Sequence, residues 1–160
     1  MKKTTDQSDM SDGRYGDWRH APMEWYPYHP DHDDYQKKGG CRRWITRCLN
    51  MYARIRQLEQ KDVDEAFEAA DSGNNVILAF TDHDYKDMEF EIDRIRDMIS
   101  NASKKYNNVH FEYCNANEAM RKALHLEEQS FDFKVALNKG SNINRLLIEV
   151  DNSIFGPQPF

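Results

Sequence analysis

The chain has 160 residues, of which 31% are charged, and a formal net charge of −6 at pH 7. This length suits one domain, alone or with an added segment, and the acidic balance argues against nucleic acid or a membrane surface as the main partner, because both require a basic face. The sequence contains neither an apolar run approaching the roughly 20 residues that cross a bilayer nor the apolar core of a secretory signal.

The cysteines of the chain predict a reducing environment. Cys41 and Cys48 lie seven residues apart and Cys114 is distant from both, which matches no metal-binding or redox Cys-x-x-Cys pattern. We expect buried free thiols. Together with the lack of a secretory signal, this indicates a cytoplasmic protein.

The first forty residues show no periodic helix or strand pattern. Residues 1–13 are polar, and we expect a mobile tail there. Residues 14–35, which we call the aromatic loop, combine prolines and histidines with large rings, among them Trp18, Trp25, Tyr26, Tyr28 and Tyr35. Because so many large rings are seldom left in water, we expect the aromatic loop to lie on a partner surface.

The next stretch predicts two helices and a strand. Apolar residues recur at helical spacing over residues 42–58. A second helix is predicted over residues 63–70, with Asp62 as its N-cap and Gly73 just beyond its end. Residues 76–80 form a short apolar run with a β-branched start, which is typical of a buried strand.

The middle of the chain continues the alternation of helices and strands. We expect a long amphipathic helix over residues 87–106, a strand over 109–113 and a short helix over 115–125. The strands at 76–80 and 109–113 would form a parallel pair joined by a right-handed crossover. Because two parallel strands need further pairing and cover, either more strands lie within residues 1–40 or the chain belongs to a larger protein.

Beyond residue 127 the pattern changes to strict alternation. Apolar residues alternate over 131–137, turn-forming residues follow at 138–142, and a second strand is predicted over 143–150. The chain therefore predicts an α/β fold over residues 14–127, followed by a β-hairpin that begins a β-rich segment over residues 128–160. This segment stops abruptly, as in a truncated domain.

An Asp-His-Asp triplet follows the strand predicted at 76–80. A carboxylate from Asp82 or Asp84 beside the imidazole of His83 can orient it and raise its pKa, which suits general acid catalysis. The start of the following helix favours bound anions near the same loop. In the alternative interpretation, both aspartates are turn or N-cap residues and His83 is an ordinary loop residue.

A second cluster within the aromatic loop has the residue types of a metal site. His29 and His32 form a His-x-x-His pair followed by Asp33 and Asp34. Imidazoles and carboxylates could bind zinc or a similar divalent ion. The alternative is a polar loop in which these groups cap turns and form hydrogen bonds.

The aromatic loop also has the residue types that recognise sugars. Apolar C–H faces of sugar rings stack on indole and phenol rings, so Trp18, Trp25 and Tyr28 are candidate substrate-binding residues, together with Arg42 just after the loop. Asp17 precedes Trp18 and is a candidate catalytic carboxylate. The alternative is that these rings pack the loop or bind another domain.

With these residues in view, residues 73–124 resemble the closing part of polysaccharide deacetylase-like barrels, the chitooligosaccharide deacetylase homology fold. That family has a late strand ending in a histidine motif, then a helix, a last strand and a short helix. The resemblance implies a partial (β/α) barrel-like parallel unit. It also implies that His83 corresponds to the late histidine, a proton donor or an orienter of the site, and that Asp17 and Trp18 correspond to an upstream Asp-Trp motif.

The implied activity is metal-dependent hydrolysis of N- or O-acetyl groups on a glycan, with Asp82 or Asp84 steadying His83. The early Asp-Asp motif of the family is not found in a matching strand context, and its His-x-x-x-His motif is missing from this sequence. The resemblance therefore implies the carboxyl-terminal part of such a hydrolase, whose missing amino-terminal half would supply the metal and the base. The alternative hypothesis is a non-enzymatic binding or interaction module that uses the aromatic loop, with further domains of the same protein among its partners.

Overall fold

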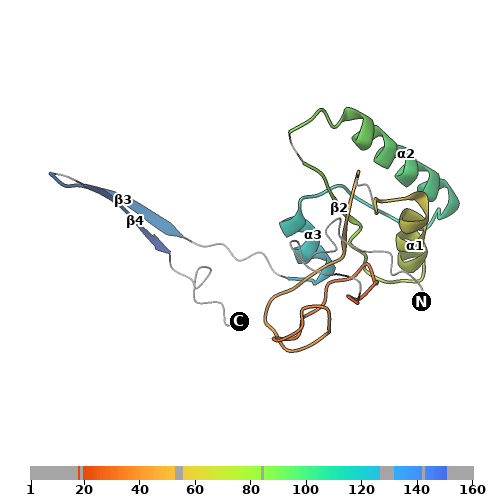
Figure 1. Cartoon of the computed structure of the whole chain (residues 1–160), viewed down its shortest axis with the longest axis horizontal. Helices are drawn as coiled ribbons and strands as arrows, with labels where there is room; N and C mark the ends of the chain where they lie inside the picture. The colour runs from red at the N-terminus through yellow and green to blue at the C-terminus, as the bar shows by residue number, and fades with distance from the viewer. Residues whose placement is uncertain are drawn as a thin grey trace. The chain divides into compact units, whose positions relative to one another are not determined.

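The structure is a computed structural model that describes residues 18, 20–52, 56–83, 85–126, 132–141 and 143–150. The chain divides into two compact units, Met1–Leu126 and Glu127–Phe160. The first contains β1, α1, β2, α2 and α3, and the second contains β3 and β4 (Figure 1). The tail expected at residues 1–13 lies outside the described residues.

A short parallel pair forms the sheet of the first unit. β1 (Cys48–Asn50) pairs with β2 (Ala79–Thr81), and α1 lies between them in sequence. The helix predicted over 42–58 is therefore wrong. Apart from β1, the described part of this stretch consists of turns and a bridge to the aromatic loop, in which the backbone amide of Ile45 donates to the Tyr28 carbonyl oxygen at 2.9 Å. Tertiary partners thus satisfy backbone groups that a helix would have satisfied internally.

The helix predicted over 63–70 is confirmed as α1 (Gln60–Asp71), which begins three residues earlier than expected. Glu59 is the N-cap, and Asp62 acts as its capping-box partner, because its carboxylate accepts the backbone N–H of Glu59 at 2.9 Å. Gly73 follows the helix with φ +89°, a left-handed conformation that favours glycine.

The strand predicted over 76–80 is displaced toward its carboxyl end. Only Ala79–Thr81 forms ladder bonds with β1. The backbone amide of Ile77 instead donates to the Trp25 carbonyl oxygen at 2.9 Å, which ties this segment to the aromatic loop. The apolar run correctly predicted a buried segment, but contacts with neighbouring segments determine which of its residues pair with β1.

The long and short helices of the middle region are confirmed as α2 (Glu89–Lys105) and α3 (Ala116–Ala123). α2 packs against α1 (Figure 1) and buries Ile95, Ile99 and Ala102 in the shared core. α3 begins with a reciprocal capping box, in which the Asn115 side chain accepts from the Glu118 amide and the Glu118 carboxylate accepts from the Asn115 amide, each at 3.0 Å.

The strand predicted over 109–113 does not form. This stretch carries no helix or strand in the structure, and Phe111 and Tyr113 are 49% and 61% exposed. The expected parallel pair of 76–80 with 109–113 is therefore wrong, and β2 pairs with β1 in its place. Alternating apolar residues favour an extended chain, but they do not choose its hydrogen-bonding partner.

The core of the first unit contains the fully buried carboxylate of Asp62 among apolar side chains. Leu58, Val63 and Ala102 are fully buried, and Asp62 is only 1% exposed. A guanidinium nitrogen of Arg47 lies 3.5 Å from the Asp62 carboxylate, and Arg56 forms a second ion pair with the same oxygen. A buried charge is tolerated because it is paired and hydrogen-bonded in this way.

The second unit confirms the predicted hairpin. β3 (Phe133–Lys139) and β4 (Asn144–Val150) pair antiparallel in a continuous register that runs from Phe133 opposite Val150 to Lys139 opposite Asn144. At the turn, the Gly140 amide donates to the carbonyl oxygen of Ile143 at 3.2 Å.

The cysteines only partly follow the expectation of buried thiols. All three are free, but Cys41 is buried whereas Cys48 and Cys114 are exposed. Within the described ranges, every helix is too short or too polar to cross a membrane.

Candidate functional site

The carboxyl ends of β1 and β2 meet at one edge of the parallel pair. Asn50 lies opposite Thr81 in the register, and the backbone amide of Met51 donates to the Thr81 carbonyl oxygen at 2.8 Å. The residues that follow, Tyr52 and Asp82, therefore leave the sheet at the same edge. In α/β folds this edge is where binding and catalytic groups gather.

Asp82 is held in place on both of its carboxylate oxygens. One oxygen accepts the backbone N–H of His83 at 2.8 Å, and the Lys86 ammonium lies 3.1 Å from the other. The side chain is only 4% exposed. Burial acts to raise the pKa of Asp82, but the His83 amide and the Lys86 ammonium outweigh it, so this pKa lies below its ordinary value.

Lys86 links three parts of this edge. Its ammonium contacts the Glu91 carboxylate of α2 at 2.6 Å as well as Asp82, and it lies 4.8 Å from the centre of the Tyr52 ring. The hydrogen bond to Glu91, and after it the bond to Asp82, raises the pKa of Lys86 above its ordinary value. The ammonium therefore connects the loop after β2 to α2, and it lies beside Tyr52, the second residue after β1.

His83 projects from this fixed loop. The residue is exposed, and its imidazole stacks on the Tyr85 ring with 5.3 Å between centroids and an interplanar angle of 26°. Asp82 holds the His83 backbone, not the imidazole, by its hydrogen bond. The predicted orienting role of Asp82 is thus replaced by anchoring of the loop, and Asp84 lies outside the described residues.

A cavity of about 280 Å³ opens beside the strand ends. Asn50 and Thr81 line it together with Trp18 and Tyr28, two of the predicted substrate-binding residues. The buried guanidinium groups of Arg47 and Arg56 also face it. The cavity is thus lined by aromatic rings, by Asn50 with its side-chain amide and by Thr81 with its hydroxyl. Thr81 lies two residues before His83 in the chain.

Of the other rings of the aromatic loop, Trp25 is packed within the first unit, whereas Tyr26 and Tyr35 are exposed. Trp25 is 4% exposed, with the Arg47 guanidinium 4.1 Å from its ring centre, and the Tyr28 hydroxyl donates to the Tyr35 carbonyl oxygen at 2.7 Å. Trp25 is therefore a core residue with no face open to a sugar. Arg42 is exposed but does not line the cavity. Asp17 lies outside the described residues.

The two candidate metal ligands of the loop differ in their surroundings. The Nδ1 atom of His29 is 3.0 Å from the Arg43 carbonyl oxygen, and its ring lies 3.6 Å from the Trp44 ring. His32 is exposed. Asp31, between them, accepts the backbone amides of Asp33 and Asp34 and closes a turn. Across the described part of the chain, no group of three or more acidic, histidine or cysteine side chains could hold a metal ion.

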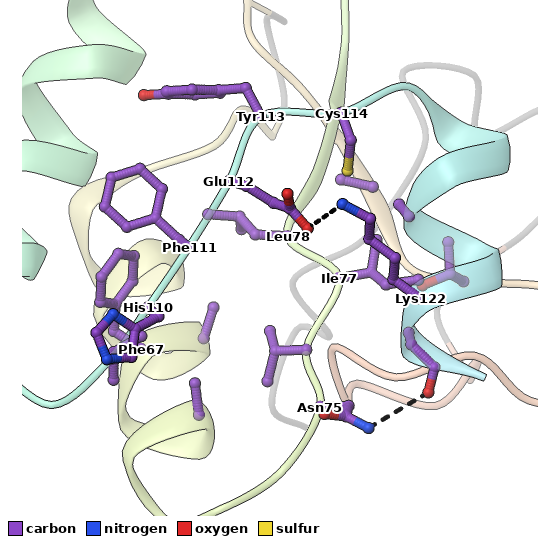
Figure 2. A pocket seen from close by; sticks show the side chains of 18 of the residues that line it. Phe67, Asn75, Ile77, Leu78, His110, Phe111, Glu112, Tyr113, Cys114 and Lys122 are labelled. Atoms are coloured by element: carbon purple, nitrogen blue, oxygen red, sulfur yellow. Dashed lines mark hydrogen bonds and ion pairs between the residues drawn. The ribbon is translucent and has the colours of Figure 1, made fainter. Parts of the chain in front are cut away.

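A larger cavity of about 480 Å³ is lined by residues of β2 and of the segment that precedes it (Figure 2). The extended segments 75–78 and 110–114 flank it, and apolar side chains such as Phe67 and Leu78 line it. Among its polar lining residues, Lys122 pairs with Glu112 and the Asn75 amide donates to the Ala123 carbonyl oxygen at 3.4 Å, whereas the buried Thr46 hydroxyl has no hydrogen-bond partner. This cavity marks the place where the expected second strand fails to pair with the first.

Comparisons of the chain with protein-family models, with curated proteins and with solved structures found no match. The functional argument therefore depends on the chemistry of the strand ends alone.

Sequence reasoning missed Tyr52, Lys86 and Glu91 as members of this site. The i,i+4 spacing of Asp82 and Lys86 resembles that of a helical ion pair, although both residues precede α2. Tyr52 had no such signal, since it was assigned to a helix that does not form.

Proposed function

We propose that this chain belongs to a hydrolase that resembles polysaccharide deacetylases and removes N- or O-acetyl groups from a glycan. The observation that supports this most is the cavity at the carboxyl ends of β1 and β2, where Trp18 and Tyr28 meet Asn50 and Thr81. In this proposal the parallel pair is part of a (β/α) barrel-like unit, and the strand-end edge faces the substrate.

His83 is the proton donor of the proposed reaction. Hydrolysis of an acetamide adds water to the carbonyl carbon, breaks the C–N bond and leaves acetate and an amine. The departing nitrogen needs a proton, and an accessible imidazole is the side chain that most often supplies one. His83 is exposed and lies two residues along the chain from Thr81, which lines the cavity.

Lys86 acts as a positioning residue for His83. It holds Asp82, and Asp82 holds the amide of His83, so the imidazole projects from a loop that is anchored to α2 through Glu91. A fixed donor lowers the entropy cost of proton transfer.

No described residue is assigned to water activation. No third ligand joins His29 and His32 in the described part of the chain, so the proposal routes no step through a metal. The proposed reaction still requires a group that activates water. For that reason the protein is tested with and without a divalent ion.

The test compares acetate release by the full-length wild-type protein and by two histidine variants of it. Purified protein is incubated with N-acetylated chito-oligosaccharides and with O-acetylated xylan, with and without Zn²⁺. We expect His83→Ala to lower turnover by about 10²–10⁴-fold, the usual contribution of a general acid. His110→Ala is the matched control, because His110 is also exposed but lines the other cavity.

Equal turnover in wild type and His83→Ala would remove the assignment of His83. A lack of acetate release from both glycans under every condition would remove the deacetylase proposal itself.

One observation favours the non-enzymatic alternative. Tyr26, Tyr35 and Trp44, in or just after the aromatic loop, remain 37–42% exposed and could contact another protein or domain. Glycan binding without acetate release, or no glycan interaction of any kind, would favour this binding module over the enzyme.

A further inference from the structure

The larger cavity separates two extended segments of the first unit. All residues that line it belong to that unit. Residues 75–78 lead into β2 along one side of the cavity, and residues 111–114 pass along the other side in the same chain direction (Figure 2). We call the space between these two segments the strand slot.

The backbone that leads into β2 is bonded along one edge. The Ile77 amide donates to a carbonyl oxygen of the aromatic loop at 2.9 Å, and the Thr81 carbonyl oxygen accepts the Met51 amide at 2.8 Å. Successive residues of an extended chain present their backbone groups to opposite edges. The backbone groups of Leu78 and Phe80 therefore point to the other edge, on the side of the slot that both residues line. Within the described ranges, the Leu78 amide donates to no other backbone group.

Side chains hold the segment on the other side of the slot. The Phe111 ring lies 5.7 Å from the Phe67 ring of α1, and the Glu112 carboxylate pairs with the Lys122 ammonium of α3. In the part of the chain that the structure describes, no amide of residues 111–114 donates to another backbone group. The segment is thus anchored by its side chains while its backbone remains available for hydrogen bonds.

The size and chemistry of the slot match an extended polypeptide. The slot has a volume of about 480 Å³. A residue in a packed sheet occupies about 160 Å³, from a rise of about 3.3 Å, a strand spacing of about 4.8 Å and a sheet spacing of about 10 Å, so about three residues fill the slot. A purely apolar ligand would cover the backbone groups without bonding them, which costs free energy, whereas a peptide backbone bonds them.

We propose that the strand slot binds an extended segment of a partner protein, which adds a strand between β2 and residues 111–114. Backbone hydrogen bonds to the slot supply the affinity, as in other cases of strand addition. The acidic and basic residues that line the slot, Glu112 and Lys122, form an ion pair, so the slot favours an uncharged segment. Leu78 and Ala119 in the lining favour apolar side chains on it.

The test compares two capped peptides on the full-length protein. The first is acetyl-Lys-Val-Ala-Val-Lys-amide, whose three central residues fill the slot and whose lysines keep it dissolved. The second has the same side chains and N-methyl groups on the three central amides. Titrations followed by amide NMR shifts should give a dissociation constant below about 1 mM for the first peptide. The second should bind at least about tenfold more weakly, because it lacks three hydrogen-bond donors.

Two tryptophan substitutions on α3 locate the binding site. Ala119→Trp fills the slot, whereas Asn117→Trp places the same ring at an exposed position that does not line it. We expect Ala119→Trp to weaken binding of the first peptide by at least about tenfold and Asn117→Trp to leave it unchanged. No binding at about 5 mM peptide, equal affinity for both peptides, or equal effects of the two tryptophans would overturn the proposal.

Hydrogen exchange of the wild-type protein covers the case in which Ala119→Trp fails to fold. Without peptide, we expect the Leu78 amide to exchange fast and the bonded Ile77 amide to exchange slowly. The first peptide should slow exchange at Leu78 by at least about tenfold and leave Ile77 unchanged. Slow exchange at Leu78 in the free protein, or exchange there that the peptide does not alter, would overturn the proposal.

Discussion

Removal of the buried Asp62 carboxylate should destabilise the first unit more than any surface change. Asp62 is 1% exposed and is the shared partner of Arg47 and Arg56, whose side chains are 3% and 9% exposed. It also accepts the Glu59 amide at the start of α1. Loss of one partner of a buried ion pair costs about 3–5 kcal/mol, and loss of a capping acceptor adds about 1 kcal/mol.

We therefore expect Asp62→Ala to lower the free energy of unfolding by about 4–6 kcal/mol, a large share of the ~5–15 kcal/mol typical of a domain. Asp62→Asn keeps an oxygen for the Glu59 amide and removes only the charge, so about 3 kcal/mol of the loss should remain. Urea unfolding followed by circular dichroism at the helix band measures both, because α1 reports on this unit.

Asp64→Ala is the matched control on the same helix. Its carboxylate pairs with Lys105 at 3.2 Å in a partly exposed setting, with side-chain exposures of 31% and 58%. Such a pair contributes about 1 kcal/mol or less. If Asp62→Ala costs under about 1 kcal/mol, or no more than Asp64→Ala, the buried triad does not stabilise the fold as argued.

Two further predictions concern the loop after β2 and the end of α1. Because the pKa of Asp82 is lowered, its ion pair with Lys86 stabilises the fold at neutral pH and is lost as the pH falls through that pKa. The difference in urea midpoint between wild type and Lys86→Met should therefore shrink on acidification below about pH 4. A difference that stays constant between about pH 3 and 7 would contradict this prediction. Gly73→Ala should cost about 1 kcal/mol in thermal unfolding, because φ is +89° there, whereas Gly40→Ala, with no neighbouring atom within 4 Å, should be neutral.

The helices and the hairpin could be predicted because their signals are local. α2 buries Ile95 and Ile99 on the stripe that their spacing predicted, and α3 begins at the capping box that Asn115 and Glu118 form. The alternation over 131–137 and 143–150 defined β3 and β4 before any partner strand was known. In each case, the residues that decide the element lie within a few positions of one another.

The strand partners and the candidate site could be predicted only in part. The approach of Trp18 and Tyr28 to Asn50 and Thr81 joins residues far apart in sequence, and the placement of Tyr52 depends on β1, which was expected to be helical. The sequence predicted a functional role for the aromatic loop, but Trp25 in this loop is a core residue. Its ring contacts the Arg47 guanidinium, and its backbone carbonyl oxygen accepts the Ile77 amide.

The sequence by itself determined the helices α1, α2 and α3, the turn of the hairpin and the residue types that stand after the buried run at 76–80. Only the tertiary structure decided that Cys48–Asn50, and not 109–113, pairs with Ala79–Thr81. The physical reason is that periodicity sets the local backbone conformation, whereas the choice of strand partner depends on contacts between distant residues that no local pattern encodes.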